Sequence, residues 1–298
     1  MLIIMSVRVG YFEVSGEVVH IIPSQSAAVT GIAKLNDTLY VNRLGVHQTA
    51  VYCPTTFQQQ RVLEFTGGRH VVGTYGRTNI DWQRETQLLD MAACDVSNCL
   101  YASDNYTSIY RSDCQNSYTN SRWSIVGYPQ GLSVTSSHNL LVALRDGQSL
   151  REYSTNGDLI REINLQPAGI SHPVHAVELS PDHFAVTHHG PKHQLSIVDS
   201  NGKLVQSYGG EKGNLNNPHG IAVDKRGRVL VADQRNNRIL VIGPKTLKAY
   251  PLPLPDCELY GPYCLHYEAA TDRLYIGEWK GQRIVCCKLG SIALAPSS

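Results

Sequence analysis

The sequence predicts an all-β fold: a six-bladed β-propeller closed by an N-terminal strand that joins the last blade. Three observations lead to this prediction: a motif that returns every 44 or 45 residues, several short apolar runs with polar turns in each copy, and no helical spacing in the clearest copy. That copy covers residues 217–242, where three apolar runs are separated by the turns 224–227 and 234–237. Short apolar runs joined by tight turns are typical of antiparallel strands.

Prolines mark the start of four copies. Pro129, Pro173, Pro218 and Pro262 are 44, 45 and 44 residues apart. A hydrophobic second strand follows each of them, at residues 140–143, 184–187, 229–232 and 274–277. Two more copies lack the proline and lie at residues 91–104 and 31–42. A sheet of this size cannot bury both of its faces alone, so we expect the six sheets to stack around an axis.

The N-terminal segment is expected to close the ring. The last copy supplies only three strands, and the apolar stretch 17–22 precedes the first copy without a partner. We therefore expect residues 1–23 to provide the outer strand of the last blade and residues 24–298 to form the propeller. One long insertion, residues 66–85, separates the first two blades. The blades are expected near residues 28–65, 87–127, 128–165, 171–210, 215–254 and 261–290.

The stretch 217–242 resembles an NHL repeat, and residues 24–290 are similar to the six-bladed NHL propeller at the end of tripartite-motif (TRIM-NHL) proteins. The match is strongest in the fifth blade and weakest in the first two. The resemblance implies a non-catalytic scaffold that binds a partner protein, or RNA in some relatives. The RING, B-box and coiled-coil segments that give such relatives ubiquitin-ligase activity have no match in this sequence, so we expect no enzyme activity and no cofactor.

Composition narrows the class of partner and the compartment. The 298 residues carry a formal net charge of +1, which gives no global field toward nucleic acid or anionic lipid, so binding to either would need a local patch. No apolar run is long enough to cross a membrane. We expect a cytoplasmic protein with reduced cysteines. The alternative is an extracellular protein in which Cys94 and Cys99, which flank a short turn, form a disulfide.

Alternating strand directions predict which loops share an end of the propeller. The loops that open each blade and the loops between its second and third strands should emerge together. The residues that end the second strands are then expected to surround the mouth of the channel: Arg43, Asp104, Leu144, His188, Asp233 and Glu278. For Asp104 and Asp233 the alternative is a structural role, in which the carboxylate accepts hydrogen bonds from turn amides.

This end of the molecule is the predicted surface for a partner protein. The residues expected to contact the partner are Arg43, Arg145, His188, His189, Lys192, Arg235, Asn237, Arg238, Trp279 and Lys280. Arginine and tryptophan commonly anchor interfaces, although the Trp279 ring could instead fold back on the adjacent blade. RNA binding by the same face is the second hypothesis, with Trp279 or Tyr106 stacking a base. The acids Asp104, Asp146, Asp233 and Glu278 oppose RNA and favour a protein.

A metal-dependent lyase or hydrolase on the axis is the third hypothesis. Histidines gather in the fourth copy, and His219 opens the fifth, in a position similar to the inner-rim histidines that hold zinc in the peptidyl-hydroxyglycine amidating lyase. The residues aligned with His219 are Gln130, Val174, Tyr263 and Asp90, so no other copy offers a matching histidine. The sequence therefore nominates no catalytic residue and no metal ligand.

Overall fold

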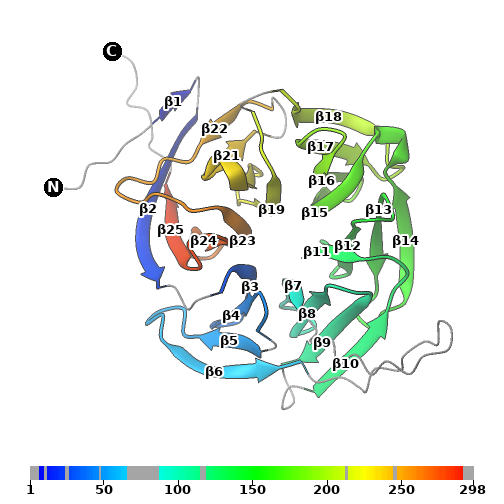
Figure 1. Cartoon of the computed structure of the whole chain (residues 1–298), viewed down its shortest axis with the longest axis horizontal. Coiled ribbons are helices and arrows are strands. Elements are labelled where there is room, and N and C mark those ends of the chain that lie inside the picture. Colours follow the sequence, from blue (N-terminus) through cyan, green and yellow to red (C-terminus); the bar gives the residue numbers. More distant parts are fainter. Residues whose placement is uncertain are drawn as a thin grey trace.

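The computed structural model describes residues 7–9, 12–23, 27–46, 48–65, 87–114, 119–211, 214–243 and 247–290. Six antiparallel sheets are arranged as blades around a central axis (Figure 1). Within the described residues the only helices are two short 3-10 turns, η1 (Gln166–Ala168) and η2 (Gln234–Asn236). The prediction of an all-β, six-bladed propeller is confirmed. The predicted insertion at residues 66–85 lies outside the described residues.

The strands of each blade follow one another from the axis to the rim. Blade one contains β3 (Val29–Leu35), β4 (Thr38–Arg43), β5 (Gln48–Tyr52) and β6 (Gln59–Glu64). Blade two contains β7 (Leu88–Cys94), β8 (Cys99–Asp104), β9 (Ser108–Asp113) and β10 (Thr119–Ser124). Blade three contains β11 (Pro129–Val134), β12 (Leu140–Leu144), β13 (Ser149–Tyr153) and β14 (Leu159–Asn164). Blade four contains β15 (Ser171–Ser180), β16 (His183–Gly190), β17 (Gln194–Asp199) and β18 (Leu204–Gly209). Blade five contains β19 (Pro218–Val223), β20 (Val229–Asp233), β21 (Arg238–Ile242) and β22 (Ala249–Pro251).

Blade six is built from both ends of the chain. Its inner strands are β23 (Pro262–Glu268), β24 (Arg273–Glu278) and β25 (Ile284–Gly290), and β2 (Phe12–Ile22) pairs with the outer edge of β25. The antiparallel register runs from Ser15 opposite Gly290 to Ile22 opposite Ile284. A short strand, β1 (Val7–Val9), pairs with β2 and makes this sheet five-stranded. Closure by the N-terminal strand, as the sequence predicts, is consistent with this sheet.

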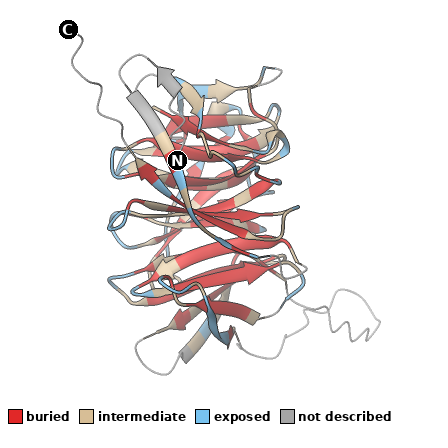
Figure 2. Cartoon of the chain, turned by 90° about the vertical axis from the view of Figure 1, so that its left-hand side faces the viewer, coloured by how far each residue is buried: buried red, intermediate tan, exposed pale blue. Residues whose placement is uncertain are grey.

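Apolar packing between neighbouring blades holds the ring together. Leu230 of blade five and Leu274 of blade six lie in one buried cluster, and Ile32 of blade one shares another with Tyr275 of blade six, where the ring closes. Each of these side chains is at most 2% exposed. Burying a side chain such as leucine or isoleucine contributes about 1.5–3 kcal/mol, so the blades stabilise one another. Figure 2 shows buried residues along the strands and exposed residues mainly in the loops at the two ends.

A bulge near the start of each inner strand lets neighbouring blades approach closely at the axis. In β11 the register shifts between Pro129 and Gly131, and corresponding shifts occur in β3, β7, β15, β19 and β23. A Cβ atom on Gly131 would lie 2.8 Å from the Cα atom of His175 in the next blade. Glycine is needed here because any side chain would collide with the backbone of blade four.

Candidate functional site

Hydrogen bonds join pairs of loops at one end of the propeller. In blade five, Asn216 donates its backbone N–H to the Asp233 carboxylate at 2.7 Å, and its carbonyl accepts the N–H of Arg235 at 3.1 Å. In blade six the N–H of Tyr260 donates to the Glu278 carboxylate at 2.8 Å. The loop that opens a blade therefore contacts the turn between its second and third strands, as predicted. We call this end the loop face and define it by residues 145–148, 189–193, 214–217, 234–237, 258–261 and 279–282.

The residues that end the second strands do not surround an open mouth, so this part of the prediction is wrong. Asp104, Asp233 and Glu278 are 0% exposed and Arg43 is 4% exposed. Leu144 and His188 are also buried. The Asp104 carboxylate accepts the backbone N–H groups of Tyr106 and Ser108 at 3.0 and 2.8 Å. The alternative of a structural carboxylate that binds turn amides is therefore confirmed for Asp104 and Asp233.

Blades five and six neutralise the buried acid in the same way. Arg238 lies five residues after Asp233, and its Nε atom is 2.7 Å from the carboxylate. Arg283 makes the equivalent contact with Glu278, also at 2.7 Å. Each arginine also donates to a carbonyl of the loop that opens its blade, Asn214 or Glu258. These charge-assisted bonds hold the loop backbones in one conformation.

Arg43 of blade one and His188 of blade four are held by groups inside the protein. Arg43 donates from Nη1 to the carbonyls of Ala27 and Gln282, at 3.0 and 2.8 Å, and so connects blades one and six. The two ring nitrogens of His188 lie 2.9 Å from the Gly190 carbonyl and the Ser196 hydroxyl. Arg43 and His188 are thus buried, although both are among the predicted partner contacts.

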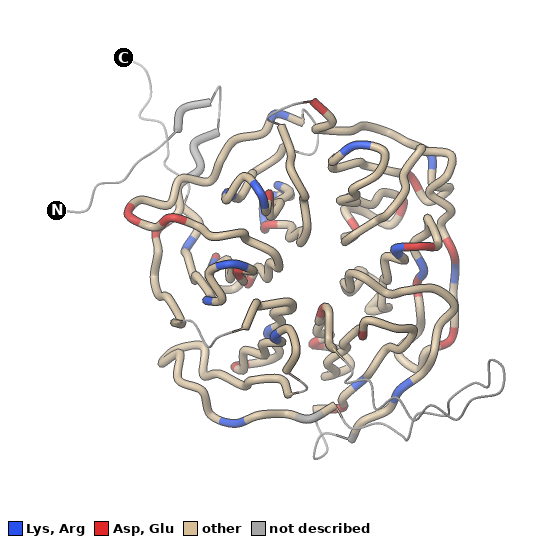
Figure 3. The backbone as a smooth tube through the Cα atoms, in the orientation of Figure 1, with Lys and Arg blue, Asp and Glu red and all other residues tan. Residues whose placement is uncertain are grey.

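The other eight predicted contacts lie on or beside the loop face. His189, Arg238 and Trp279 are partly buried, and five residues are exposed: Arg145, Lys192, Arg235, Asn237 and Lys280. Asn237 adopts a left-handed backbone with φ of 52° and accepts the Gly261 N–H at 2.8 Å, which connects blades five and six. Figure 3 shows basic residues on several loops around the axis. Asp104, Asp233 and Glu278 are buried, so they neutralise the exposed arginines and lysines of the loop face less than the sequence suggests.

A row of aromatic rings crosses the loop face from blade four to blade six. We call it the aromatic row: His193, His189, His219, Tyr263 and Trp279. Its successive ring centroids are 5.4, 5.0, 4.1 and 4.8 Å apart. Trp279 contacts Tyr263 of its own blade, whereas the sequence alternative placed its ring on the adjacent blade. The sequence gives no direct signal for this row, because its members come from strands and loops far apart in the chain.

Two histidines of the aromatic row, His189 and His219, are neutral at pH 7 because they are buried. Burial lowers the pKa of His189 to about 4, and it lowers the pKa of His219 well below the usual value. The Nε2 atom of His189 lies 3.1 Å from the Pro218 carbonyl, which fixes a proton on that nitrogen. His193 accepts the backbone N–H of Asn217 at Nδ1, at 3.1 Å. The rings of His189 and His219 therefore offer polarisable faces rather than charges.

The pairing of β7 with β8 corrects the alignment of one axial residue. Leu88 pairs with Asp104 as Pro218 pairs with Asp233, so Leu89, and not Asp90, is the equivalent of His219. Asp90 occupies the next position, which is Gly131 in blade three, His175 in blade four and Cys264 in blade six. The sequence alignment missed this because the second copy lacks the proline that fixes the register of the later copies.

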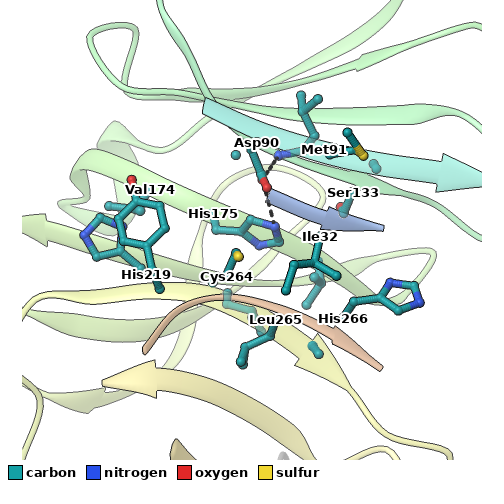
Figure 4. Close-up of a pocket in the computed structure, with 18 of the residues that line it drawn as sticks. Ile32, Asp90, Met91, Ser133, Val174, His175, His219, Cys264, Leu265 and His266 are labelled. Carbon is teal, nitrogen blue, oxygen red and sulfur yellow. Dashed lines mark hydrogen bonds and ion pairs between the residues drawn. The ribbon is translucent and has the colours of Figure 1, made fainter. Parts of the chain in front are cut away.

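Asp90 and His175 meet on the axis as a consequence. The Asp90 carboxylate accepts the Leu132 backbone N–H at 2.8 Å and lies 3.4 Å from the Nε2 atom of His175. Figure 4 shows this contact together with Cys264 and His219. The contact between Asp90 and His175 connects blades two and four, which are not neighbours. Blade three lies between them, and its residue at this position is Gly131, which has no side chain to block the contact.

Among the described residues, no three His, Cys, Asp or Glu side chains converge as a metal site. No helix in the described part of the chain is long and apolar enough to span a membrane. Cys94 and Cys99 lie opposite each other across a hairpin, as expected, and all eight cysteines are free thiols.

One blade of this chain matches the model of a repeat family, and part of the chain is similar in sequence to a known protein. Residues 215–242 match the model of the NHL repeat family. "Protein brain tumor" of Drosophila melanogaster is 25% identical over 118 residues, which is 38% of this chain and 11% of that protein. The chain therefore matches only a small part of that relative.

Solved structures agree with the fold. A protein of unknown function from Bacteroides thetaiotaomicron has a TM-score of 0.67 at 11% identity, over 93% of this chain and 77% of that one. A streptogramin B lyase has a TM-score of 0.63 at 13% identity, over 94% and 98%. Virginiamycin B lyase from Staphylococcus aureus has a TM-score of 0.62 at 13% identity, over 95% and 90%. At these identities the likeness shows the fold alone. The chain is a six-bladed β-propeller whose fifth blade carries an NHL repeat.

Proposed function

We propose that this propeller is a non-catalytic interaction module that presents its loop face to a partner protein. The observation that carries the proposal is the combination of a rigid loop backbone with exposed side chains. The buried Asp233–Arg238 and Glu278–Arg283 pairs fix the loops, while Arg235 and Lys280 on the same turns remain exposed. Preorganised loops lose little conformational freedom on binding, so their contacts contribute more to affinity.

The composition of the loop face suits a protein interface. Trp279 lies at one end of the aromatic row and is partly buried, with the exposed Lys280 beside it. Arg145, Lys192 and Arg235 add exposed cations on three other blades. An interface with a central aromatic anchor and a charged rim favours a partner with an acidic surface, because complementary charge speeds association and aligns the partner. The free thiols support a further proposal, that the protein works in a reducing compartment such as the cytoplasm.

The test compares loop-face variants with a charge-matched variant at the other end. Arg235→Glu and Trp279→Ala alter the loop face, whereas Lys203→Glu makes the same charge change on the exposed β17–β18 turn at the opposite end. Partners are captured by cross-linking in cell extract, identified by mass spectrometry, and then measured as purified proteins. We expect binding to be lost in the first two variants and kept in Lys203→Glu, with melting temperatures unchanged. Equal binding by all three would refute the assignment of the face.

RNA binding by the same face is the second candidate, and the aromatic row favours it. Stacked rings beside exposed cations can hold single-stranded bases and phosphates together. A titration with single-stranded RNA at several salt concentrations separates the candidates, since phosphate contacts make the affinity fall steeply with salt. A flat response would remove this candidate. The likeness to the two lyases shows only a shared fold, so no lyase activity is proposed.

A further inference from the structure

A cavity of about 290 Å³ lies on the propeller axis, between the inner strands of the six blades. We call it the axial cavity. At the loop face its lining includes one residue from each blade, which follows the inner-strand residue paired with the end of the second strand: Thr30, Leu89, Gln130, Val174, His219 and Tyr263. We call these six residues the entry ring. His219 and Tyr263 also belong to the aromatic row, so the cavity and the row form one continuous surface.

Asp90 and His175 lie deeper in the axial cavity than the entry ring. Each is one residue farther along its inner strand than the entry-ring residue of its blade. Figure 4 shows the pair between His219 on one side and His266 on the other. The side chains of Asp90 and His175 are each 11% exposed, so part of their surface faces the cavity that they line. A group that enters from the loop face therefore passes His219 before it meets Asp90.

The Asp90 carboxylate can accept a further hydrogen bond from inside the axial cavity. Its Oδ2 atom accepts the Leu132 N–H at 2.8 Å and lies 3.4 Å from the Nε2 atom of His175. Both contacts use the same oxygen, so Oδ1 can accept a donor that enters the cavity. The buried acids Asp233 and Glu278, by contrast, each have an arginine at 2.7 Å. A buried carboxylate is costly without donors, so a hydrogen bond to Asp90 stabilises a complex more than the same bond in water.

His219 and Tyr263 give the entrance an aromatic wall. Their ring centroids are 4.1 Å apart, and Trp279 extends the wall, 4.8 Å from Tyr263. The side-chain amide of Asn217 donates to the Nε2 atom of His219 at 3.1 Å, which holds this ring in place. Burial lowers the pKa of His219 and raises the pKa of the Tyr263 hydroxyl, so both rings are uncharged at pH 7. Such ring faces favour contact with another aromatic ring.

The charges around and inside the axial cavity favour a neutral occupant. The loop face exposes four cations that repel a cationic side chain: Arg145, Lys192, Arg235 and Lys280. The described residues that line the cavity include the acids Asp90 and Glu178 but no lysine or arginine, so an entering anion finds no countercharge. Among neutral side chains, the phenol of tyrosine combines an aromatic ring with an O–H donor at its tip.

We propose that the partner protein inserts a tyrosine side chain through the entry ring, with its ring against His219 and Tyr263 and its hydroxyl donating to Asp90. This inference rests on the proposed function, because it names the side chain with which the partner anchors itself on the loop face. The volume is sufficient, since a cavity of about 150 Å³ already holds a benzene molecule. Tyrosine is also enriched among the residues that dominate the binding energy of interfaces.

The first experiment needs no partner. The full chain is titrated with p-cresol, toluene and propylguanidinium, which represent the side chains of tyrosine, phenylalanine and arginine. Binding is followed by NMR through the amide signal of Leu132, which donates to Asp90. We expect p-cresol to shift this signal and to bind about tenfold more tightly than the other two probes, because it alone combines a ring with a neutral donor. Equal affinity for p-cresol and toluene, tighter binding of propylguanidinium, or an unchanged Leu132 signal would overturn the proposal.

Two matched variants test whether Asp90 is the acceptor. Asp90→Asn keeps an oxygen for the Leu132 N–H but removes the charge, so the preference for p-cresol over toluene should fall to about threefold or less. Glu178→Gln alters a second acid of the axial cavity, which pairs with Phe184 at the end of β15 far from the entry ring, and should leave the preference unchanged. Equal loss in both variants would overturn the assignment of Asp90. If Asp90→Asn does not fold, the probe titration of the unmodified protein decides.

The second experiment uses the partner identified with the loop-face variants. Each of its surface tyrosines is changed to phenylalanine, which removes only the hydroxyl. One change should weaken binding by about tenfold, and its effect should fall to about threefold or less against Asp90→Asn, because the hydroxyl and the carboxylate act as a pair. A partner that binds the loop face but tolerates every such change would overturn this inference and leave the proposed function intact. Unchanged binding by Arg235→Glu and Trp279→Ala would instead refute the proposed function, and the probe titration tells the two failures apart.

Discussion

Replacing Asp233 by asparagine should destabilise the propeller far more than the same replacement at Asp146. Asp233 is 0% exposed and accepts three hydrogen bonds, from the Asn216 N–H at 2.7 Å, the Asn236 side chain at 2.8 Å and Arg238 at 2.7 Å. Asparagine keeps one acceptor oxygen but presents an amide group to two donors. The loss of the buried charge also leaves Arg238 without its carboxylate.

The size of the effect follows from burial. Breaking a fully buried ion pair from one side costs about 3–5 kcal/mol. The Arg238 side chain is 30% exposed and regains some hydration, so we expect a loss of about 2–4 kcal/mol in the free energy of unfolding. For a domain of this size that loss lowers the melting temperature by about 3–6 °C. Asp146 also accepts a backbone N–H, from Tyr128 at 2.8 Å, but it is exposed, so Asp146→Asn should cost about 1 kcal/mol or less.

Urea unfolding followed by circular dichroism, with melting curves as a second measure, compares the two variants with the unmodified protein. Asp233→Asn should also weaken partner binding, because Asn216 and Arg235 lose their common support on the loop face. Arg235→Glu, by contrast, should weaken binding without loss of stability. Equal stability of Asp233→Asn and Asp146→Asn would show that the buried pair does not hold the loops, and the argument for a rigid loop face would fail.

Three further predictions concern the ring closure, the buried histidines and one cysteine. Removal of residues 1–23 leaves β25 with an open edge, so the truncated protein should aggregate in light scattering, and a monomer with unchanged melting would contradict this. Burial lowers the pKa of His175, His189 and His266 to about 4, below the unfolded value of about 6.5. Between these two pH values the unfolded chain binds more protons than the folded protein. The stability of the protein should therefore fall as the pH drops from about 6.5 to about 4. The raised pKa of Asp90 acts in the opposite direction and offsets one histidine; a urea midpoint that stays constant from pH 7 to pH 5 would refute the prediction. Hydrogen bonds with Thr55 and Thr56 lower the pKa of Cys53 to about 6, whereas burial raises the pKa of Cys114 to about 11. Iodoacetamide at pH 7 should therefore modify Cys53 before Cys114. Mass spectrometry that finds Cys114 modified earlier would contradict this prediction.

The prolines explain why the fold was predictable from the sequence. Pro129, Pro218 and Pro262 each begin an inner strand, and Pro173 is the third residue of β15. A missing N–H is tolerated near the start of a strand, so the spacing of the prolines reports the spacing of the blades. The closing strand was predictable because an apolar run without a partner complements a blade that lacks a strand. Its start at Phe12, upstream of the expected residue 17, was not, since that part of the strand lacks a continuous apolar run.

The details of the site depended on geometry that one sequence does not contain. The strand register places Asp90 one position away from the sequence alignment and brings it to His175, in a blade that is not its neighbour. The ends of the second strands were expected to be open, but an arginine five residues later covers Asp233 and Glu278. Both effects come from contacts between separate segments, whereas sequence patterns report mainly local structure.

The pairing of β2 with β25 has a consequence for the order of folding. Ile22 pairs with Ile284, so nearly the whole chain lies between the two partners. The pairing of β2 with β25 cannot form until both strands are present. Contacts between such distant segments carry a large loop-closure entropy and slow the folding of β-rich domains. During synthesis the earlier blades can assemble side by side, but the ring stays unsealed until the last strand leaves the ribosome. Chaperone demand should therefore be greatest while β25 has not yet been made.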